Sequence, residues 1–484
     1  MSASREKKKR QELSAGGAVD PKAAKAAEAK AAERRSNILY GTVAAVIVVV
    51  AVALVVYNSG IFQRNQTAVT IGGENYSVAK TSYYYQQVCS SYASMFGSDY
   101  LQSMKSQAVE NMKFIHAAAS AAKAANMKLE SDDQKAVQDN LDSLKAAAKS
   151  AGYGYGAYLK AVYGPYMTNS VLKSCMEDQT LASKYVNQYS EDNFVYSDED
   201  VQTYYEGHKD SYDLVNGGYV AVSGTPEAKT DADGNAVEAT DEEKAAALAA
   251  AKETAEAILA DLKKGVSLET SAGKYDNATY TGSEEMSSST TVAGQWLFDE
   301  ARRTGDAEVL ADEDNSRYYV AQFNSRKRDE TLDYNVRHIL VTGENLELAD
   351  GETATEEQLT AKAQEILNGW DGTEDGFAKL AEQYSKDTGS NTNGGLYEDV
   401  PKNYMIAPFE DWCYEDGRQS GDTGVVYYSG TGAHVMYFVG YGDTPYWHYA
   451  CESALRSSDS NEWQASLTNS VNAEVNAGGM KNVS

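Results

Sequence analysis

The chain has 484 residues, 42% of them hydrophobic, and carries 71 Asp and Glu against 43 Lys and Arg, for a net charge of −28. A chain of this length and composition forms several folded domains. The acidic balance disfavours a role in nucleic-acid binding, because the phosphate backbone is itself negative. Its plainest interpretation is a soluble, self-repelling surface. The alternative is a surface that attracts basic unfolded chains or a cation-rich cell wall.

The N-terminal residues predict a membrane anchor. Residues 1–36 form a tail rich in Ala, Lys and Glu, with ten Lys or Arg and five Asp or Glu. Residues 37–57 are almost wholly apolar and carry no charge, and about 20 such residues cross a bilayer. The basic pair Arg34-Arg35 beside the span predicts a cytoplasmic N-terminus and an extracytoplasmic bulk of the chain. The alternative is a cleaved signal peptide, but no convincing small-x-small cleavage site follows Tyr57.

Residues 66–213 are predicted to be mainly helical after a short strand at 68–74. An apolar stripe at spacings of three and four runs from Leu101 to Ala122, as in an amphipathic helix packed on a core. A Tyr-Tyr-Glu helix over 198–206 then leads towards the next region. This layout resembles the helical chaperone region of the SurA and PrsA class of extracytoplasmic foldases.

Two histidines stand at either end of the next well-marked region, residues 329–442. His338 opens the strand-like run His-Ile-Leu-Val, and His434 opens His-Val-Met-Tyr-Phe. Helical spacing marks 359–367 and 377–384 between them. If the two strands are neighbours in one sheet, the histidines can meet, because adjacent strands lie about 4.8 Å apart. The alternative is a pair of ordinary core histidines in an α+β domain.

The ordered series of motifs around these histidines resembles the parvulin-type peptidyl-prolyl isomerases. The series adds Tyr-Ser-Lys-Asp ending at Asp387, a Gly-Gly pair at 394–395 and Met-Ile-Ala-Pro-Phe-Glu from Met405 to Glu410. The resemblance implies a polar network of His338, His434, Asp387 and Thr431, the last being a Thr where many parvulins carry Ser. It also implies an apolar pocket for the substrate proline formed by Met405 and Phe409.

One departure from the family pattern concerns the Gly-Gly loop. The family has Gly-Gly-Asp-Leu-Gly, whereas this chain has Gly-Gly-Leu-Tyr-Glu. Leu396 is therefore the nearest candidate for the pocket-lining leucine.

The implied reaction is rotation about X–Pro bonds, which requires no cofactor and no metal. The four cysteines are widely spaced without a Cys-x-x-Cys pair, which also argues against a zinc or redox motif.

Residues 214–328 are predicted to be a second, degenerate copy of this domain. Gly218–Val222 takes the place of the first histidine strand, and Tyr319–Phe323 the place of the second. Both histidine positions are then tyrosines, Tyr219 and Tyr319, and no Asp or Met-x-x-Pro-Phe stretch accompanies them. The alternative is chance similarity between two αβ patterns.

Residues 443–484 are predicted to form two helices, 447–455 and 462–471, which the resemblance implies fold back on the helical region. The polar stretch Ser457–Asn461 is expected to be a break or a cap between them.

The whole sequence thus predicts a multidomain α+β protein with one transmembrane helix, a helical chaperone-like region and two parvulin-like domains. Its expected function is that of a cell-membrane foldase that isomerises X–Pro bonds in unfolded or partly folded secreted proteins. Two other classes stay open. One is a holdase chaperone without catalysis, which the altered Gly-Gly loop favours. The other is a structural or adhesive surface protein, which the 35 tyrosines allow.

Overall fold

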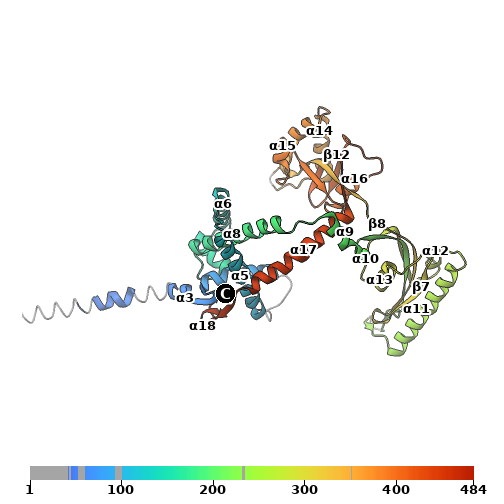
Figure 1. The fold of residues 1–484 in the computed structure, drawn as a ribbon, viewed down its shortest axis with the longest axis horizontal. Helices are drawn as coiled ribbons and strands as arrows, with labels where there is room; N and C mark the ends of the chain where they lie inside the picture. Colours follow the sequence, from blue (N-terminus) through green and yellow to red (C-terminus); the bar gives the residue numbers. More distant parts are fainter. Residues whose placement is uncertain (1–41, 43–44, 53–59, 93–100, 232–234, 350) are drawn as a thin grey trace, which may run out of the picture. The chain divides into compact units, whose positions relative to one another are not determined.

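The fold is taken from a computed structural model, which describes residues 42, 45–52, 60–92, 101–231, 235–349 and 351–484 (Figure 1). The chain divides into two compact units. One comprises the residues up to Asn193 together with Ser460–Ser484, and the other is Phe194–Asp459. The multidomain α+β class predicted from the sequence is confirmed by the sheets and helices of these units.

No helix among the described residues is long and apolar enough to cross a bilayer. The predicted tail, 1–36, lies outside the described residues. So does the predicted anchor, 37–57, apart from Thr42 and the helical residues 45–52. The anchor therefore stays a prediction.

The first unit contains a small antiparallel sheet packed with helices. The strand order of this sheet is β13-β1-β2. Its core is apolar and includes Ile71, Met112, Leu141 and Leu172, each almost fully buried. Its elements are β1 Thr67–Ile71, β2 Glu74–Ser77, β13 Ala473–Val475, α3 Ile61–Asn65, α4 Val78–Tyr92, α5 Leu101–Ala124, α6 Ser131–Ser150, α7 Tyr155–Tyr163, α8 Asn169–Asn193 and α18 Ala477–Met480.

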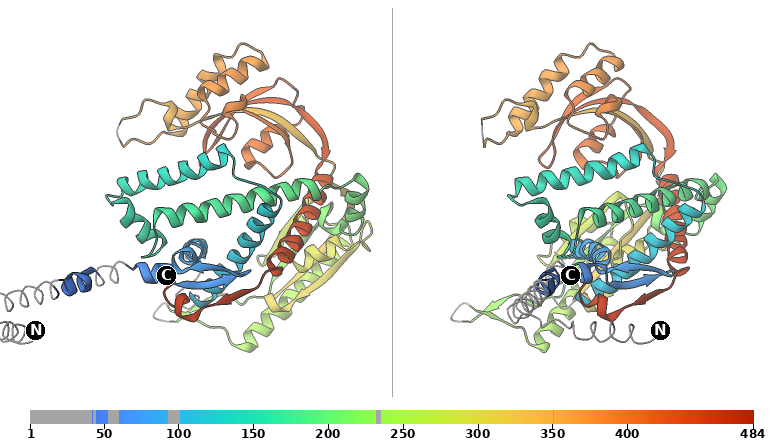
Figure 2. Two further views of the ribbon diagram at one scale, coloured as in Figure 1. Left: turned by 60° about the vertical axis from the view of Figure 1, so that its left-hand side comes forward. Right: turned by 90° about the vertical axis from the view of Figure 1, so that its left-hand side faces the viewer.

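The C-terminal residues belong to this unit because β13 pairs antiparallel with β1, with Val475 opposite Val69. Figure 2 shows β13, in red, beside the blue strands. The predicted break at Ser457–Asn461 is wrong, since α17 runs unbroken over Tyr446–Asn469. The stretch contains no Gly or Pro, and each Ser, Asp or Asn costs a helix only a fraction of a kcal/mol.

The second unit begins with two short helices and continues into two four-stranded antiparallel sheets. The short helices are α9 Asp198–Glu206 and α10 Lys209–Tyr212. The first sheet has the order β6-β3-β8-β7. Its elements are β3 Asp213–Ser223, the hairpin β4 Lys229–Thr230 and β5 Ala236–Val237, α11 Asp241–Leu262, α12 Leu268–Ala272, β6 Ala278–Met286, α13 Val292–Phe298, β7 Ala307–Asp312, η2 Glu313–Asn315 and β8 Arg317–Arg328.

The second sheet has the order β10-β9-β12-β11 and contains both predicted histidine strands as central neighbours. Its elements are β9 Leu332–Val341, η3 Gly343–Asn345, α14 Glu356–Asn368, α15 Glu374–Tyr384, η4 Asn391–Asn393, β10 Leu396–Val400, α16 Ala407–Cys413, β11 Thr423–Tyr428 and β12 Gly432–Pro445. The predicted helices over 359–367 and 377–384 correspond to α14 and α15.

The two sheets share one connectivity. Apart from the β4–β5 hairpin that follows β3, the first strand in both is followed by two α-helices, the edge strand next to it, a short α-helix, and a final hairpin whose last strand pairs with the first. Thus β3, β6, β7 and β8 correspond in order to β9, β10, β11 and β12. The strand order that a duplicated domain requires is therefore present.

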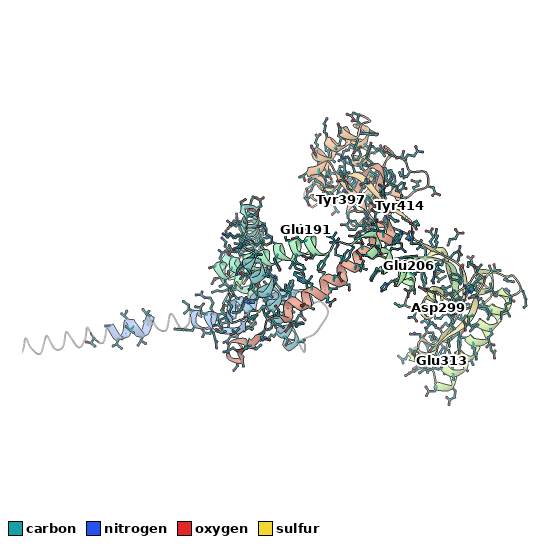
Figure 3. All side chains as sticks on the ribbon, viewed as in Figure 1. Glu191, Glu206, Asp299, Glu313, Tyr397 and Tyr414 are labelled. Carbon is teal, nitrogen blue, oxygen red and sulfur yellow. The ribbon has the colours of Figure 1, made fainter. Side chains whose placement is uncertain are left out.

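The acidic composition is visible on the surface. Among the many side chains that Figure 3 shows, the labelled Glu191, Glu206, Asp299 and Glu313 are all exposed. They come from both units, so the negative charge is not confined to one part of the chain.

Candidate active site

The second sheet has two different buried faces, which the alternation of its strands creates. On one face, Ile339, Val341 and Val435 pack under α14 and α15. On the other, Tyr334, Val336, Met436 and Phe438 pack with α16. His338 and His434 belong by alternation to the second face, which we call the α16 face.

The register places the two histidines diagonally across neighbouring strands. His338 lies opposite Met436, and His434 lies opposite Leu340. A diagonal pair is within reach of long side chains, and here the two Nδ1 atoms are 3.2 Å apart. The rings are nearly parallel, at 18°, with centroids 5.4 Å apart, and each residue is 5% exposed. The two rings therefore form one buried unit.

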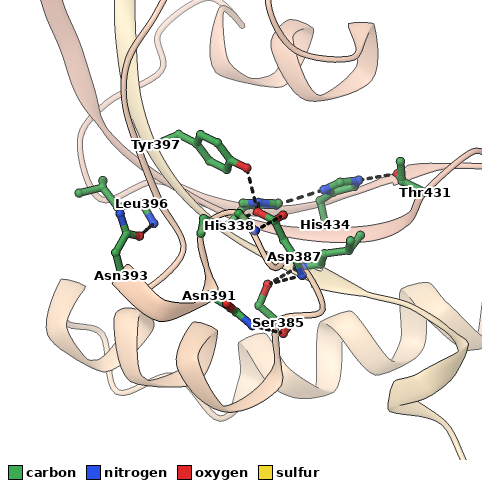
Figure 4. Close-up of polar contacts among 12 residues, drawn as sticks. His338, Ser385, Asp387, Asn391, Asn393, Leu396, Tyr397, Thr431 and His434 are labelled. Carbon is green, nitrogen blue, oxygen red and sulfur yellow. Dashed lines mark hydrogen bonds and ion pairs between the residues drawn. The ribbon is translucent and has the colours of Figure 1, made fainter. Parts of the chain in front are cut away.

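Asp387 reaches this unit because its loop is held against the end of β9. Leu340 donates its N–H to Ser385 Oγ at 3.1 Å and accepts from Lys386 N at 2.9 Å. Ser385 is the C-cap residue that directly follows α15. The C-terminus of α15 is thereby fixed beside β9, and Asp387 Oδ2 lies 2.9 Å from His338 Nε2 (Figure 4).

Asp387 is the most heavily hydrogen-bonded carboxylate of the site. Besides His338, the hydroxyls of Ser390 and Tyr397 donate to Oδ2, and Gly389 N donates to Oδ1. These bonds, with His338 as the largest contribution, hold the pKa of the Asp387 carboxyl well below its usual range. The acid is therefore ionised at neutral pH and acts only as an acceptor.

Whereas Asp387 favours its charged form, His434 favours its neutral form. Burial, followed by the neighbouring His338, lowers the pKa of His434 from 6.5 to about 4. Its ring is neutral at pH 7, with one nitrogen donating and one accepting. The exposed Thr431 places its hydroxyl 2.8 Å from His434 Nε2.

These protonation states determine which atom donates and which accepts in the hydrogen bonds of the network. Ionised Asp387 must accept from His338 Nε2–H. If His338 carries this single ring proton, its Nδ1 accepts from His434 Nδ1–H. The Nε2 atom of His434 then accepts from the Thr431 hydroxyl. Every polar atom of the two buried rings is paired in this arrangement, which avoids the roughly 1–3 kcal/mol that an unsatisfied buried group costs.

Phe409 closes the site from α16. Its ring stands edge-on to His338, at 5.4 Å between centroids, and to His434, at 5.7 Å. It is 2% exposed, so most of the ring packs against the protein. Met405 is half-buried against the same apolar cluster and is the more accessible of the two.

Leu396 is the one predicted residue that the structure does not bring to the site. It lies opposite Arg337 in the β9–β10 register, whereas Tyr397 lies opposite Val336 on the α16 face. Figure 4 shows Leu396 beside Asn393, apart from the histidine pair, and Tyr397 beside Asp387. The ring of Tyr397 approaches His338 at 5.5 Å, and burial raises the pKa of its hydroxyl to about 12.

The Gly-Gly pair sets this register. Gly394 and Gly395 have φ values of 71° and 74°, a conformation that favours glycine. A Cβ on Gly395 would lie 2.3 Å from His338 O, and His338 N donates to Gly395 O at 2.8 Å. Both glycines are thus required for β10 to approach the His338 backbone.

Sequence reasoning missed three members of the site: Ser385, Ser390 and Tyr397. Ser385 stood within the quoted Tyr-Ser-Lys-Asp motif, where its side chain could have been recognised as a loop anchor. Tyr397 stood in the altered Gly-Gly loop, and alternation along β10 would have placed it or Leu396 on the site face. No local pattern marks Ser390, which is fully buried.

Part of the chain matches a known protein family. Residues 318–439 match the family model described as PPIC-type PPIASE domain. No curated protein matches the sequence. Solved structures with similarity include the peptidylprolyl isomerase PrsA of Bacillus anthracis, at 21% identity and a TM-score of 0.20, covering 29% of this chain and 59% of that one. Another is PrsA of Bacillus subtilis, at 11% identity and a TM-score of 0.29, covering 79% and 84%.

A third is the foldase protein PrsA of Streptococcus pneumoniae, at 12% identity and a TM-score of 0.26, covering 75% of this chain and 80% of that one. TM-scores this low carry no argument about how the whole chain is arranged. The family model is the stronger result, since its match contains both histidines, Asp387, Met405, Phe409 and Thr431. The chain therefore carries a PPIC-type peptidyl-prolyl isomerase domain at residues 318–439, as the parvulin resemblance of its sequence predicted.

Proposed function

We propose that the chain is a membrane-anchored extracytoplasmic foldase whose PPIC-type domain catalyses cis/trans isomerisation of X–Pro bonds in secreted proteins. The observation that carries the proposal is the chain of hydrogen bonds from Thr431 through the two buried histidines, His434 and His338, to Asp387. A structural core has no need for two histidines and an ionised acid on one sheet face. The helical unit would bind unfolded clients, as foldases of this class do.

The chemistry asked of such a site is bond rotation. An X–Pro peptide bond has a barrier of roughly 18–20 kcal/mol, and catalysis requires only that the twisted amide be held better than either planar form. In the proposed complex the proline ring packs against Met405 and the small exposed part of Phe409. The fixed dipoles of the histidine chain and the Thr431 hydroxyl then act on the rotating amide. Tyr397 and Ser390 act indirectly, by positioning Asp387.

A holdase without catalysis is the second candidate. The burial of Phe409 favours it, because a ring that is 2% exposed offers a proline little surface. Such a protein would keep the fold of the domain and bind extended chains without accelerating their isomerisation. The two candidates differ in a single measurable property, the turnover of an X–Pro bond.

The test is the cis–trans exchange rate of a short X–Pro peptide, measured by NMR with the full chain in detergent. We expect acceleration by the wild-type protein and, for Asp387→Asn, a loss on the order of 100-fold, comparable to removal of one electrostatic group from an active site. Asp375→Asn is the matched control, because Asp375 is an exposed carboxylate on α15 of the same domain. A folded wild-type protein that leaves the exchange rate unchanged would establish the holdase instead.

The proposal of an anchor is supported by the helical residues 45–52. The aliphatic side chains from Val46 to Val50, together with Val52, are between 50% and 67% exposed, which is unfavourable in water and favourable in lipid. Protease added to intact cells should therefore degrade the chain beyond about Tyr57 and leave the basic tail intact. A soluble form without the tail in the medium would instead establish cleavage.

We also propose that residues 214–328 are a duplicated isomerase domain that has lost its site. The shared connectivity supports this, and so does a repeated stretch: Trp296 is followed by Arg302-Arg-Thr-Gly-Asp306, and Trp412 by Arg418-Gln-Ser-Gly-Asp422, at equal spacing. In both copies the Gly N–H and the Asp carbonyl pair with a phenylalanine of the last strand, Phe323 and Phe438 respectively.

A further inference from the structure

A groove lies between α5 and β13 in the helical unit. Its volume is about 380 Å³. One wall is a single face of α5 and the other is the C-terminal strand with the residues around it. The groove is lined by Lys105, Ser106, Val109, Glu110, Lys113, Asn472, Ala473, Val475 and Met480.

The strand in this groove is the edge of its sheet, since the order is β13-β1-β2 (Figure 2). The flanking bonds towards β1 are Gly72 N to Asn472 O, at 3.1 Å, and Asn476 N to Ala68 O, at 2.9 Å. Backbone groups alternate in direction along an antiparallel strand. Residues 472, 474 and 476 therefore bond towards β1, and the N–H and C=O groups of Ala473 and Val475 point away from it.

The side chains of β13 divide in the same way. Ala473 and Val475 line the groove, whereas Glu474 projects from the other face of the strand by alternation. Val475 is 55% exposed although it is apolar. Within the described part of the chain, the edge thus offers unpaired backbone donors and acceptors together with small apolar contacts, which is the combination that a peptide added as a further strand uses.

The opposite wall has a basic character that is unusual in so acidic a chain. Lys105 and Lys113 stand two helical turns apart on the groove face of α5, with one acid, Glu110, between them. Lys113 Nζ lies 2.9 Å from Glu110, and its side chain is only 12% exposed. Lys105 Nζ donates to Met480 O at 3.2 Å, so the lysine is held at the strand side of the groove.

We propose that this groove binds an extended, acidic peptide segment by strand addition to β13. Ala473 and Val475 form the backbone hydrogen bonds, and Lys105 and Lys113 pair with the carboxylates of the segment. The ligand is a protein segment with alternating acidic and β-branched side chains. This binding goes beyond the isomerase activity and requires no proline.

The probe is a fluorescein-labelled peptide that alternates Val with Glu and contains no proline, titrated by fluorescence anisotropy against the full chain in detergent. We expect saturable binding that is lost when the glutamates are replaced by lysines. We also expect loss when the peptide is N-methylated at alternate residues, because N-methylation removes the donors that an added strand presents to β13. Isomerase turnover is measured separately, so failure of either proposal leaves the other intact.

Two variants localise the binding. Val475→Pro removes an edge-facing N–H that β1 does not use, and edge strands tolerate proline at such positions. We expect about tenfold weaker binding from the lost hydrogen bond and its contacts. Lys113→Glu should weaken binding of the glutamate peptide by a similar factor. Its matched control is Lys135→Glu on α6, the same charge change at a side chain that is 74% exposed and outside the groove, which should leave the affinity unchanged.

Several outcomes would overturn the inference. If Lys113→Glu bound the peptide as tightly as wild type, the groove would not be the site. The same conclusion would follow if Lys135→Glu lowered the affinity as much as Lys113→Glu does. Undiminished binding of the N-methylated peptide would exclude strand addition. If the wild type self-associates and Val475→Pro is monomeric without any effect on peptide affinity, the edge is an interface between two copies of the chain.

Discussion

The two sheets of the second unit have the same connectivity but different chemistry at equivalent positions. In the second sheet, His338 lies opposite Met436 and His434 opposite Leu340; in the first, Tyr219 lies opposite Ala321 and Tyr319 opposite Ala221. The two tyrosines thus occupy the two histidine positions in register. Their rings meet edge to face, at 5.5 Å and 84°.

The short helix that packs on this face also differs between the two sheets. Phe409 stands three residues before Trp412, and the residue three before Trp296 is Ala293, which is fully buried. The comparison teaches that the fold depends on the shared apolar faces and hairpins. The histidine–aspartate network is an addition to this fold and not a condition for it.

Converting the second sheet to the first should abolish catalysis. We expect His338→Tyr with His434→Tyr to lower X–Pro turnover by on the order of 100-fold or more, because the directed network disappears and Asp387 loses its main donor. NMR exchange measures the turnover, and circular dichroism checks the fold. The reverse change in the first sheet, Tyr219→His with Tyr319→His, should add no activity, since no acid accompanies it. Turnover retained by the tyrosine pair would show that the network is not catalytic.

Phe409→Ala gives the α16 face the residue of the first sheet. The buried ring touches both histidines, so its removal leaves a cavity and should cost about 3–5 kcal/mol of unfolding free energy. Chemical denaturation measures the loss for this domain. If the variant is as stable as wild type, the comparison fails, because the difference between Phe409 and Ala293 would then have no effect on packing.

Acid should destabilise the second sheet through protonation of His434. The folded-state pKa of His434 is lowered to about 4 from 6.5. Between these values the unfolded state binds the proton and the folded state does not, so stability is complete above about pH 6.5 and falls as the pH falls towards 4. The full shift corresponds to about 3 kcal/mol. His434→Gln should remove this pH dependence, measured by denaturation at pH 7 and pH 5.

Below that window Asp387 acts in the same direction. Its folded-state pKa is depressed, so the stability it contributes is present above its unfolded pKa and is lost as pH falls through the folded value. The His434→Gln protein should therefore still lose stability in stronger acid. An unchanged slope between pH 7 and pH 5 in this variant would mean that His434 is not the titrating group.

The smallest effects concern Arg302 and Arg418, which occupy equivalent positions in the two copies. Arg418 stacks over Trp412 at 3.8 Å and donates to Trp412 O, whereas Arg302 stacks over Trp296 at 4.6 Å with a buried Nε that has no partner. We expect Arg418→Ala to cost about 1–2 kcal/mol and Arg302→Ala about 1 kcal/mol or less. Neither should change turnover in the exchange assay. A larger loss for Arg302→Ala would reverse this ranking of the two copies.

Much of the candidate site could be predicted from the sequence because its signals are local. A β-branched run after His338, a Tyr-Ser-Lys-Asp motif and a Met-x-x-Pro-Phe motif each lie within a few residues. The resemblance of this ordered series to the parvulins implied that His338, His434, Asp387 and Thr431 meet. Helical periodicity likewise predicted α5, α14 and α15.

What only the tertiary structure decided is non-local. Whether Leu396 or Tyr397 faces the histidines depends on the register between β10 and β9, because a shift of one residue exchanges the two faces of a strand. Ser390 belongs to the network only because a loop brings it back to Asp387. The strand β13 has three residues and no pattern of its own; it exists because β1, some 400 residues earlier, supplies its hydrogen bonds.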